Sequence, residues 1–386
     1  MKPSRSTAPL LLAFAYLGLT TGLWGAEIAG VKERTGLSAQ GLGLVLALLP
    51  VGTFVGLALH RRILARFSHG LLLAGAELGS AAVLVGLLNA RSPIQVGLAL
   101  LLLGVTLCQV NVAANHYGAR LEVAEGRPLM ASLHAPFGYG LATGAALVYI
   151  AHLVEQRQAA TAVALVLVTV ATAAASMRLA PMPGSAEQPE RPTRTGSGGF
   201  GPRSLLIPAV AATCAVAESG ISDWITVYLR AESGATTAVA ALGFTALAAA
   251  LTIGRMFGDL ITGVLGDVRM VRLSGATTAL GVVILLLSPT LVAAFVGVVV
   301  CGLGLSSLSP RILAAAGRAG DADPAVLTRV IGFSTVGSLA GPPLIGTTSA
   351  ALGLPAAYAL LAVLVGAVGA SAGVLREHRA TPTTTS

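Results

Sequence analysis

Residues 8–30 read APLLLAFAYLGLTTGLWGAEIAG and contain a single charged side chain, Glu27. A helix that crosses the hydrocarbon core of a bilayer needs about 20 mostly apolar residues, and this stretch supplies them. Residues 205–229 form another long, mostly apolar run. Both runs are too long for the core helices of a soluble protein, so the sequence predicts an all-α polytopic membrane protein.

The composition supports the same class. The 386-residue chain is 55% hydrophobic and 10% charged, whereas soluble domains carry about 25% charged residues. Residues 96–105, VGLALLLLGV, do not alternate between apolar and polar side chains. A membrane-spanning β-strand would alternate in that way, so the pattern favours helices.

The net charge of +8 does not indicate nucleic-acid binding, because aromatic residues make up only 4% of the chain and the basic residues lie between apolar runs. Cys108, Cys214 and Cys301 all fall inside apolar runs, which argues against disulfides and a metal site. The first apolar run lacks a small-residue cleavage site, so we expect an uncleaved anchor. We expect no cofactor.

Twelve membrane spans are predicted, in two pseudo-symmetric groups of six. A Pro-, Gly- and Ser-rich segment separates the groups, and its composition is typical of a flexible connection. We therefore predict a six-helix bundle over residues 1–179, a cytoplasmic linker over 180–203, and a second bundle with a short tail over 204–386. The predicted spans are 8–30, 38–60, 71–89, 93–117, 129–151, 158–178, 204–230, 237–260, 271–288, 290–313, 328–350 and 355–375.

The distribution of basic residues gives an orientation. If Met1 is cytoplasmic, five of the 24 Lys and Arg residues lie outside (Lys32, Arg34, Arg91, Arg157 and Arg230), which leaves 19 inside. Cytoplasmic loops of membrane proteins carry an excess of Lys and Arg. The sequence thus predicts an even number of spans with both termini in the cytoplasm.

Glycine patterns recur in the two groups of spans. Gly52 and Gly56 in the second span have counterparts in Gly254 and Gly258 in the eighth, and internal repeats are typical of transporters that bind their substrate at the bilayer midplane. Further glycines in the fifth and eleventh spans allow close helix packing. They mark either ordinary packing or the interfaces that rock between open states, and Gly341-Pro342-Pro343 favours the second interpretation because proline kinks a helix.

Charges within a span are costly and usually functional. Glu218 lies near the middle of the seventh span and is our candidate for a proton-binding or substrate-binding carboxylate; the alternative is a structural carboxylate paired with a neighbouring helix. Asp223, five positions further on, lies about 140° away around the helix, so the two cannot face each other. Trp224 and Tyr228 are either interfacial aromatics or stacking surfaces.

Polar side chains end the fourth span, where Gln109, Asn111 and Asn115 occur. The two asparagines are four residues apart and share a helix face, where they either bind a polar solute or bridge helices. His134, at the start of the fifth span, either titrates near neutral pH or is a structural hydrogen-bonding residue. Trp24 and Glu27 are expected to line the outer vestibule.

Charged residues also close the eighth span. Arg255 and Asp259 are four residues apart and can meet on one helix face, so we predict that they take part in a charge network at an inner gate. The chain has no G-x-x-x-x-G-K-[ST] loop, which argues against ATP-driven transport, and no other catalytic motif. We therefore expect that it is not an enzyme.

Four stretches resemble the major facilitator superfamily, and most closely its bacterial fucose-permease-like group. They are WGAEIAGVKERTGLS (24–38), NVAANHYGARLEVAEGRPLMASLHA (111–135), AESGISDWITVYLR (217–230) and GSLAGPPLIG (337–346). GRMFGD at 254–259 is similar to the second copy of the inner-loop signature of the superfamily, whereas the first copy, near residues 56–70, lacks the expected aspartate.

The resemblance implies two six-helix bundles around a central cavity, alternating access, and coupling to protons in a bacterial cytoplasmic membrane. We expect a monomeric secondary transporter of a small organic solute. The alternative is a proton antiporter that exports drugs or amphipathic metabolites. The glycine-proline signature of antiporters is incomplete in the fifth span, because Pro136 precedes the glycines.

Overall fold

The computed structural model describes residues 7–126, 129–154, 157–179, 202–320 and 324–375, and all of their regular structure is helical. The first seven helices are α1 (Thr7–Thr35), α2 (Ala39–Leu46), α3 (Leu48–Leu64), α4 (His69–Leu88), α5 (Pro93–Glu125), α6 (Met130–Ala151) and α7 (Arg157–Ser176). They are followed by α8 (Pro202–Glu232), α9 (Thr237–Leu265), α10 (Asp267–Leu287), α11 (Leu291–Leu305), α12 (Leu308–Gly320), α13 (Pro324–Leu352), α14 (Leu354–Ala370) and the short 3₁₀ helix η1 (Ser371–Leu375).

These helices make twelve crossings, as predicted. The second crossing is divided into α2 and α3, and the tenth into α11 and α12. Eleven stretches of the described residues are long and apolar enough to span a membrane. The remaining crossing is α6, whose 22 residues include Ser132, His134 and Thr143. These polar side chains lower the hydropathy of α6, which is long enough to cross but is not among the eleven.

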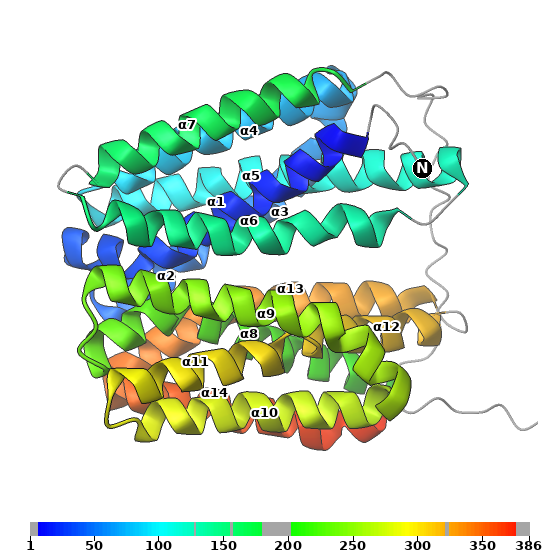
Figure 1. Ribbon diagram of the computed structural model, residues 1–386. Helices are drawn as coiled ribbons and strands as arrows, with labels where there is room; N and C mark the ends of the chain where they lie inside the picture. Colours follow the sequence, from blue (N-terminus) through cyan, green and yellow to red (C-terminus); the bar gives the residue numbers. More distant parts are fainter. Residues whose placement is uncertain (1–6, 127–128, 155–156, 180–201, 321–323, 376–386) are drawn as a thin grey trace, which may run out of the picture.

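Figure 1 shows the helices running side by side, with α1–α7 in one layer and α8–α14 in the other. We call the end at which α1 begins and α7 ends the linker face, at the right of Figure 1, and the end at which α1 and α8 finish the far face. Residues 180–201 of the predicted linker, and the tail beyond residue 375, lie outside the described residues. The exact domain boundaries remain a prediction.

Short side-chain caps begin several of the helices. Ser38, Ser68 and Ser92 each accept a hydrogen bond from the backbone N–H three residues later, at the starts of α2, α4 and α5. Thr236 and Thr290 do the same for α9 and α11. Such caps satisfy N–H groups that have no partner within the helix. They allow the chain to re-enter the membrane after only a few turn residues.

Glycine brings the helices of each half into backbone contact. A Cβ atom at Gly144 of α6 would lie 2.0 Å from the carbonyl oxygen of Leu19 in α1, and one at Gly52 of α3 would lie 2.0 Å from that of Leu101 in α5. In the second half, a Cβ at Gly337 of α13 would lie 2.3 Å from the backbone of α8. The prediction of close packing at these glycines is confirmed, because no side chain fits at such distances.

The two halves also meet through small residues. A Cβ at Gly43 of α2 would lie 2.6 Å from the Pro342 carbonyl oxygen of α13, and one at Gly25 of α1 would lie 2.2 Å from the Phe244 ring of α9. Gly43 and Gly25 lie in the half of the bundle nearer the far face. The contacts at Gly25 and Gly43 therefore bring the halves together toward the far face.

Candidate functional site

The tenth crossing is interrupted close to its middle. α11 ends at Leu305, α12 begins at Leu308, and the hydroxyl of Ser306 donates to the Leu303 carbonyl oxygen at 2.7 Å. Gly254 of α9 leaves room for this turn, since a Cβ there would lie 2.4 Å from Ser306 Oγ. Interrupted helices near the midplane are a recurrent way of building a transporter's binding site.

This break directs Ser309 toward Glu218 of α8. The Ser309 hydroxyl donates a hydrogen bond to Glu218 Oε2, and Glu218 Oε1 lies 3.9 Å from Arg255 Nη2 of α9. Cys214 Sγ, one turn earlier on α8, is 3.6 Å from Ser309 Oγ. The carboxylate thus lies beside the first turn of α12, where the partial positive charge of a helix start favours an anion.

The Glu218 cluster is open rather than sealed. The side chain of Glu218 is 29% exposed and that of Arg255 is 42% exposed. Charged groups in the middle of a membrane span do not face hydrocarbon without a large energetic cost. We therefore expect the exposed sides of Glu218 and Arg255 to face water rather than lipid.

A second polar cluster lies in the other half. Asn115 Nδ2 donates to both the carbonyl and the side-chain oxygen of Asn111, each at 2.8 Å, and His134 Nε2 is 3.0 Å from Asn115 Oδ1. The His134 ring also contacts Phe14 of α1, with a centroid separation of 4.3 Å. The three polar residues of this predicted set are brought together by α5 and α6.

The two clusters lie at a comparable depth. Arg255 is ten residues before the end of α9, and Asn115 is ten residues before the end of α5. Both helices end at the linker face, so each residue lies about 15 Å from its helix end. We call the Glu218 cluster (Glu218, Arg255, Ser309) and the Asn115 cluster (Asn111, Asn115, His134) together the candidate transport site.

Gln109 lies apart from this site. It is 4% exposed, its Oε1 is 2.8 Å from His60 Nδ1, and its Nε2 donates to the Gly56 carbonyl oxygen at 2.7 Å. Those bonds join α5 to α3. We therefore leave Gln109 out of the candidate transport site.

Asp223 and Trp224 differ in their surroundings. Asp223 is partly buried, and none of the described residues gives it a hydrogen bond or an ion pair. Trp224 is fully buried, and Tyr228 is 2% exposed with its ring 4.3 Å from that of Tyr358. The two aromatics therefore form neither an exposed interfacial belt nor a stacking surface, because both pack inside the second half.

Trp24 and Glu27 are buried too, at 5% and 4% exposure, so they line no open vestibule in this arrangement, and their place in an outer vestibule stays a prediction. Glu27 Oε1 is 3.1 Å from Arg34 Nη1, and its Oε2 is 3.1 Å from His152 Nε2 of the turn after α6. A buried carboxylate needs such partners. Here they fix the end of α1 to the end of α6.

The predicted pairing of Arg255 with Asp259 is also replaced. Asp259 accepts a hydrogen bond from Arg311 of α12, and Arg311 Nη1 lies 3.8 Å from Asp267 at the start of α10. Arg255 instead approaches Glu218. Asp259 therefore belongs to a charge network among α9, α10 and α12 near the linker face, and Arg255 belongs to the candidate transport site.

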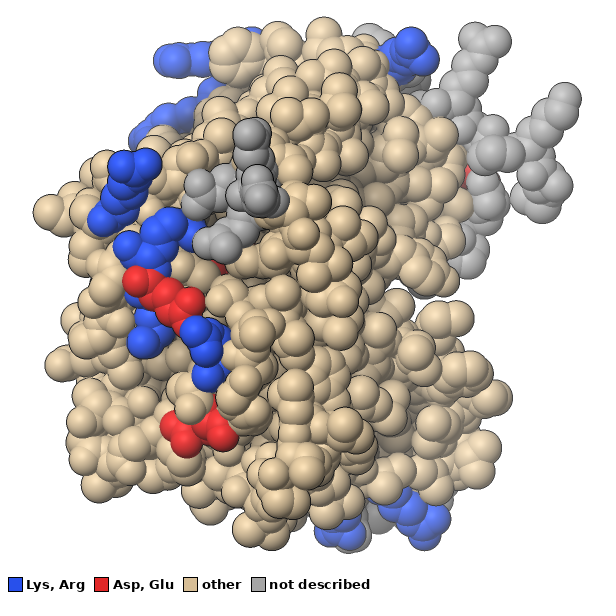
Figure 2. Space-filling model, turned by 60° about the vertical axis from the view of Figure 1, so that its left-hand side comes forward, with Lys and Arg blue, Asp and Glu red and all other residues tan. Residues whose placement is uncertain are grey.

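One ion pair between the halves has no counterpart in the sequence-based predictions. Arg230 Nε, near the end of α8, is 2.5 Å from Glu33 Oε1 near the end of α1, and the Thr237 hydroxyl donates to Glu33 Oε2 at 3.2 Å. We call these three residues the far-face latch. Figure 2, in which the far face is turned forward, shows acidic and basic side chains side by side in a band at the left, and further basic side chains at the top and bottom edges.

Gly341 and Pro342 lie on two different contacts of α13. A Cβ at Gly341 would lie 2.1 Å from Ser219 Oγ of α8, which is a contact within the second half. The carbonyl of Pro342 faces Gly43 of α2, which is a contact between the halves. At Gly341 and Pro342, α13 therefore packs against α8 of its own half and against α2 of the other half.

A twelve-crossing helical bundle in two halves, each with a polar cluster at mid-depth, is typical of a membrane transporter. The chain is 30% identical over 366 residues to an uncharacterized MFS-type transporter of Yersinia pestis, covering 94% of this chain and 93% of the relative. It is 26% identical to an uncharacterized transporter, y4wD, of Sinorhizobium fredii, over 94% of this chain and 96% of that protein. The chain therefore belongs to the major facilitator superfamily and is a transporter rather than an enzyme.

Other comparisons agree with this assignment. The membrane protein MosC of Rhizobium meliloti is 30% identical over 42% of this chain and 40% of its own length. The solved nucleoside transporter NupG (D323A mutant) superimposes with a TM-score of 0.76 at 12% identity, over 95% of this chain and 100% of NupG. A bacterial homologue of the lysosomal transporter Spinster, in an inward-facing and occupied conformation, gives 0.72 at 14% identity over 97% of each chain. No protein-family model matches the sequence.

Proposed function

We propose that this protein is a proton-coupled secondary carrier of a small organic solute that works by alternating access. The observation that carries the proposal is the partly exposed carboxylate of Glu218 in the middle of α8, held by Ser309 and 3.9 Å from Arg255. A titratable group with water access at mid-membrane is what proton coupling requires.

The Glu218 cluster offers a simple coupling reaction. When Glu218 is ionised, its charge attracts the Arg255 guanidinium across 3.9 Å. When Glu218 binds a proton, that attraction is lost and Arg255 is free to interact with the solute or with water. Protonation thus changes the charge of one wall of the site, and a charge change that favours one conformation is how a ligand shifts a two-state equilibrium.

The Asn115 cluster supplies the opposite wall. Amide and imidazole groups donate and accept hydrogen bonds, and the neighbouring Phe14 ring adds an apolar surface. We propose that these residues orient the polar groups of the solute. At 12% identity the likeness to NupG gives the fold alone, so we do not extend its nucleoside substrate to this chain, and membership of the fucose-permease-like group stays a prediction.

We also propose that the linker face is cytoplasmic, in a bacterial inner membrane. The observed helix ends place Lys32, Arg34, Arg91 and Arg230 at the far face, and the excess of basic residues lies on the other side. The halves are in contact near the far face through Gly43 and through the latch. We propose an inward-facing arrangement under this orientation, because these contacts close the far face.

The far-face latch gives the first testable prediction. Arg230→Glu places two carboxylates together, so we expect a shift toward the outward-open state of about 3- to 10-fold, because an exposed ion pair contributes about 0.2–1 kcal/mol and reversal adds repulsion. The measurement is the rate at which a membrane-impermeant maleimide labels Ala39→Cys at the start of α2, which lies beside Gly346 of α13 in the closed arrangement.

The matching control is the double variant Glu33→Arg/Arg230→Glu, which restores the opposite charges in exchanged positions. It should return labelling toward the wild-type rate. Equal labelling of Ala39→Cys in all three backgrounds would show that the far-face latch does not contribute to closing the far face.

The transport proposal itself is tested in two steps. A thermal-shift screen of the purified protein against sugars and cationic drugs identifies a bound solute. Uptake of that labelled solute into proteoliposomes is then measured under opposite pH gradients. A symporter accumulates the solute when the outside is acidic, and an antiporter does so when the lumen is acidic. Uptake that is the same under both gradients would contradict proton coupling.

A further inference from the structure

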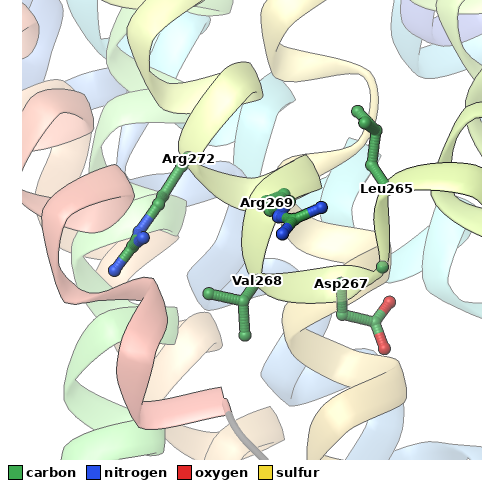
Figure 3. A pocket seen from close by; sticks show the side chains of 6 residues that line it. Leu265, Asp267, Val268, Arg269 and Arg272 are labelled. Atoms are coloured by element: carbon green, nitrogen blue, oxygen red, sulfur yellow. The ribbon is translucent and has the colours of Figure 1, made fainter.

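A pocket opens at the linker face, away from the candidate transport site, where the chain turns from α9 into α10. It has a volume of about 390 Å³ and is lined by Leu265, Gly266, Asp267, Val268, Arg269 and Arg272. Figure 3 shows the side chains of Arg269 and Arg272 on the first turns of α10, with Asp267 and Leu265 at the turn itself. The pocket belongs to the second half alone.

The pocket carries positive charge that is not neutralised by neighbouring side chains of the described residues. Arg269 and Arg272 are both exposed, and neither has an ion pair or side-chain hydrogen bond with any described residue. The one acidic group, Asp267, lies 3.8 Å from Arg311 Nη1, so its charge is directed to a partner outside the pocket. Two guanidinium groups without partners favour an anion with several oxygen acceptors.

An apolar stripe leads from the membrane to this pocket. Phe257, Leu260, Ile261 and Val264 recur at the spacing of one helix face on the last turns of α9, with exposures of 52%, 71%, 39% and 80%. The stripe ends directly before Leu265, which lines the pocket. An apolar surface that continues into a basic pocket at a helix end matches the acyl chains and the headgroup of one lipid.

We propose that the α9–α10 turn binds one anionic phospholipid, with the headgroup phosphate between Arg269 and Arg272 and an acyl chain along the α9 stripe. Free phosphate would use the arginines but not the stripe. A zwitterionic lipid would use the stripe but gain less from the two positive charges. The combination of the two surfaces selects a lipid with a net negative charge.

The test measures lipid binding to the full-length protein in detergent. Purified protein is titrated with phosphatidylglycerol, phosphatidylcholine or glycerol phosphate, and retained lipid is counted by native mass spectrometry. We expect one phosphatidylglycerol to be retained by the wild type, and roughly twenty-five-fold weaker binding in Arg269→Gln/Arg272→Gln, since each basic residue near an anionic lipid contributes about fivefold.

The matched control is Arg62→Gln/Arg66→Gln, which removes two exposed arginines from the same face in the first half. It should retain phosphatidylglycerol as the wild type does. If the double variant at 269 and 272 does not fold, Arg269→Gln alone should show a fivefold loss, and Leu260→Gln should weaken lipid binding while leaving the arginines in place.

Equal retention of phosphatidylglycerol by the wild type and Arg269→Gln/Arg272→Gln would overturn the proposal. So would equal retention of phosphatidylcholine, or retention of glycerol phosphate as strong as that of phosphatidylglycerol. The measurement involves no transport, so its outcome does not depend on the proposed function.

Discussion

Glu218→Gln should abolish the accumulation of solute against its gradient while leaving exchange across the membrane partly intact. A one-to-one proton symporter can reach about tenfold accumulation for each pH unit, since one unit corresponds to about 1.4 kcal/mol. Glutamine keeps the size of the side chain and its bond with Ser309 but cannot bind or release a proton. The accumulation ratio in proteoliposomes should therefore fall to about one.

The control for this variant is Glu232→Gln, at the exposed far-face end of the same helix. It removes the same charge from α8 outside the candidate transport site and should accumulate solute like the wild type. Wild-type accumulation in Glu218→Gln would remove Glu218 from proton coupling. Loss of both accumulation and exchange would assign it to solute binding instead.

Gly144→Ala should markedly lower the stability of the first half. The new Cβ would lie 2.0 Å from the Leu19 carbonyl oxygen, and a backbone atom cannot move aside as a flexible side chain can. Overpacking of this kind costs typically 1–3 kcal/mol, which exceeds the gain of up to about 1 kcal/mol from replacing glycine with alanine in a helix. We expect a lower melting temperature in detergent and less folded protein.

Gly75→Ala of α4 is the matched control, because no atom lies within 4 Å of the position its Cβ would take. This variant gains the higher helix propensity of alanine without a steric clash. It should therefore melt at or slightly above the wild-type temperature. If the two variants melted at the same temperature, backbone contact between α1 and α6 would not be what holds this half together.

The twelve crossings were predictable because the thickness of the hydrocarbon core sets the length and the apolar character of each span. Helix ends within charged segments were less predictable. The eighth span was expected to stop at residue 260, yet α9 continues to Leu265. Arg255 and Asp259 find partners on α8 and α12, so their charges do not end the helix.

The interruption of the tenth crossing was not predicted, although Pro310 gives a local signal for it, because proline has no N–H and its ring clashes with the carbonyl group four residues earlier, at Ser306. Packing of Ser306 and Ser307 against Gly254 and Gly258 of α9 also stabilises the turn. Its consequence for the site is large, since it positions Ser309 beside Glu218.

The candidate site residues could be predicted one by one, but their partners on other helices could not. Glu218, Asn111, Asn115 and His134 were found from polarity within apolar runs, and the structure gathers them into two clusters. The pairing of Arg255 with Glu218 and of Glu33 with Arg230 was missed, because sequence spacing reports only on partners within one helix. The available signal for the latch was the presence of opposite charges at the ends of the first and seventh spans.

The most direct measurement is the distance between the halves at the linker face as a function of pH. Val123→Cys at the end of α5 and Val264→Cys at the end of α9 are exposed sites for spin labels, and the native Cys108, Cys214 and Cys301 are buried. We expect the distance distribution of the wild type to shift between its open and closed populations as pH changes, and that of Glu218→Gln to stay fixed. A pH response of the same size in both proteins would show that the proton acts elsewhere and contradict the role given to Glu218.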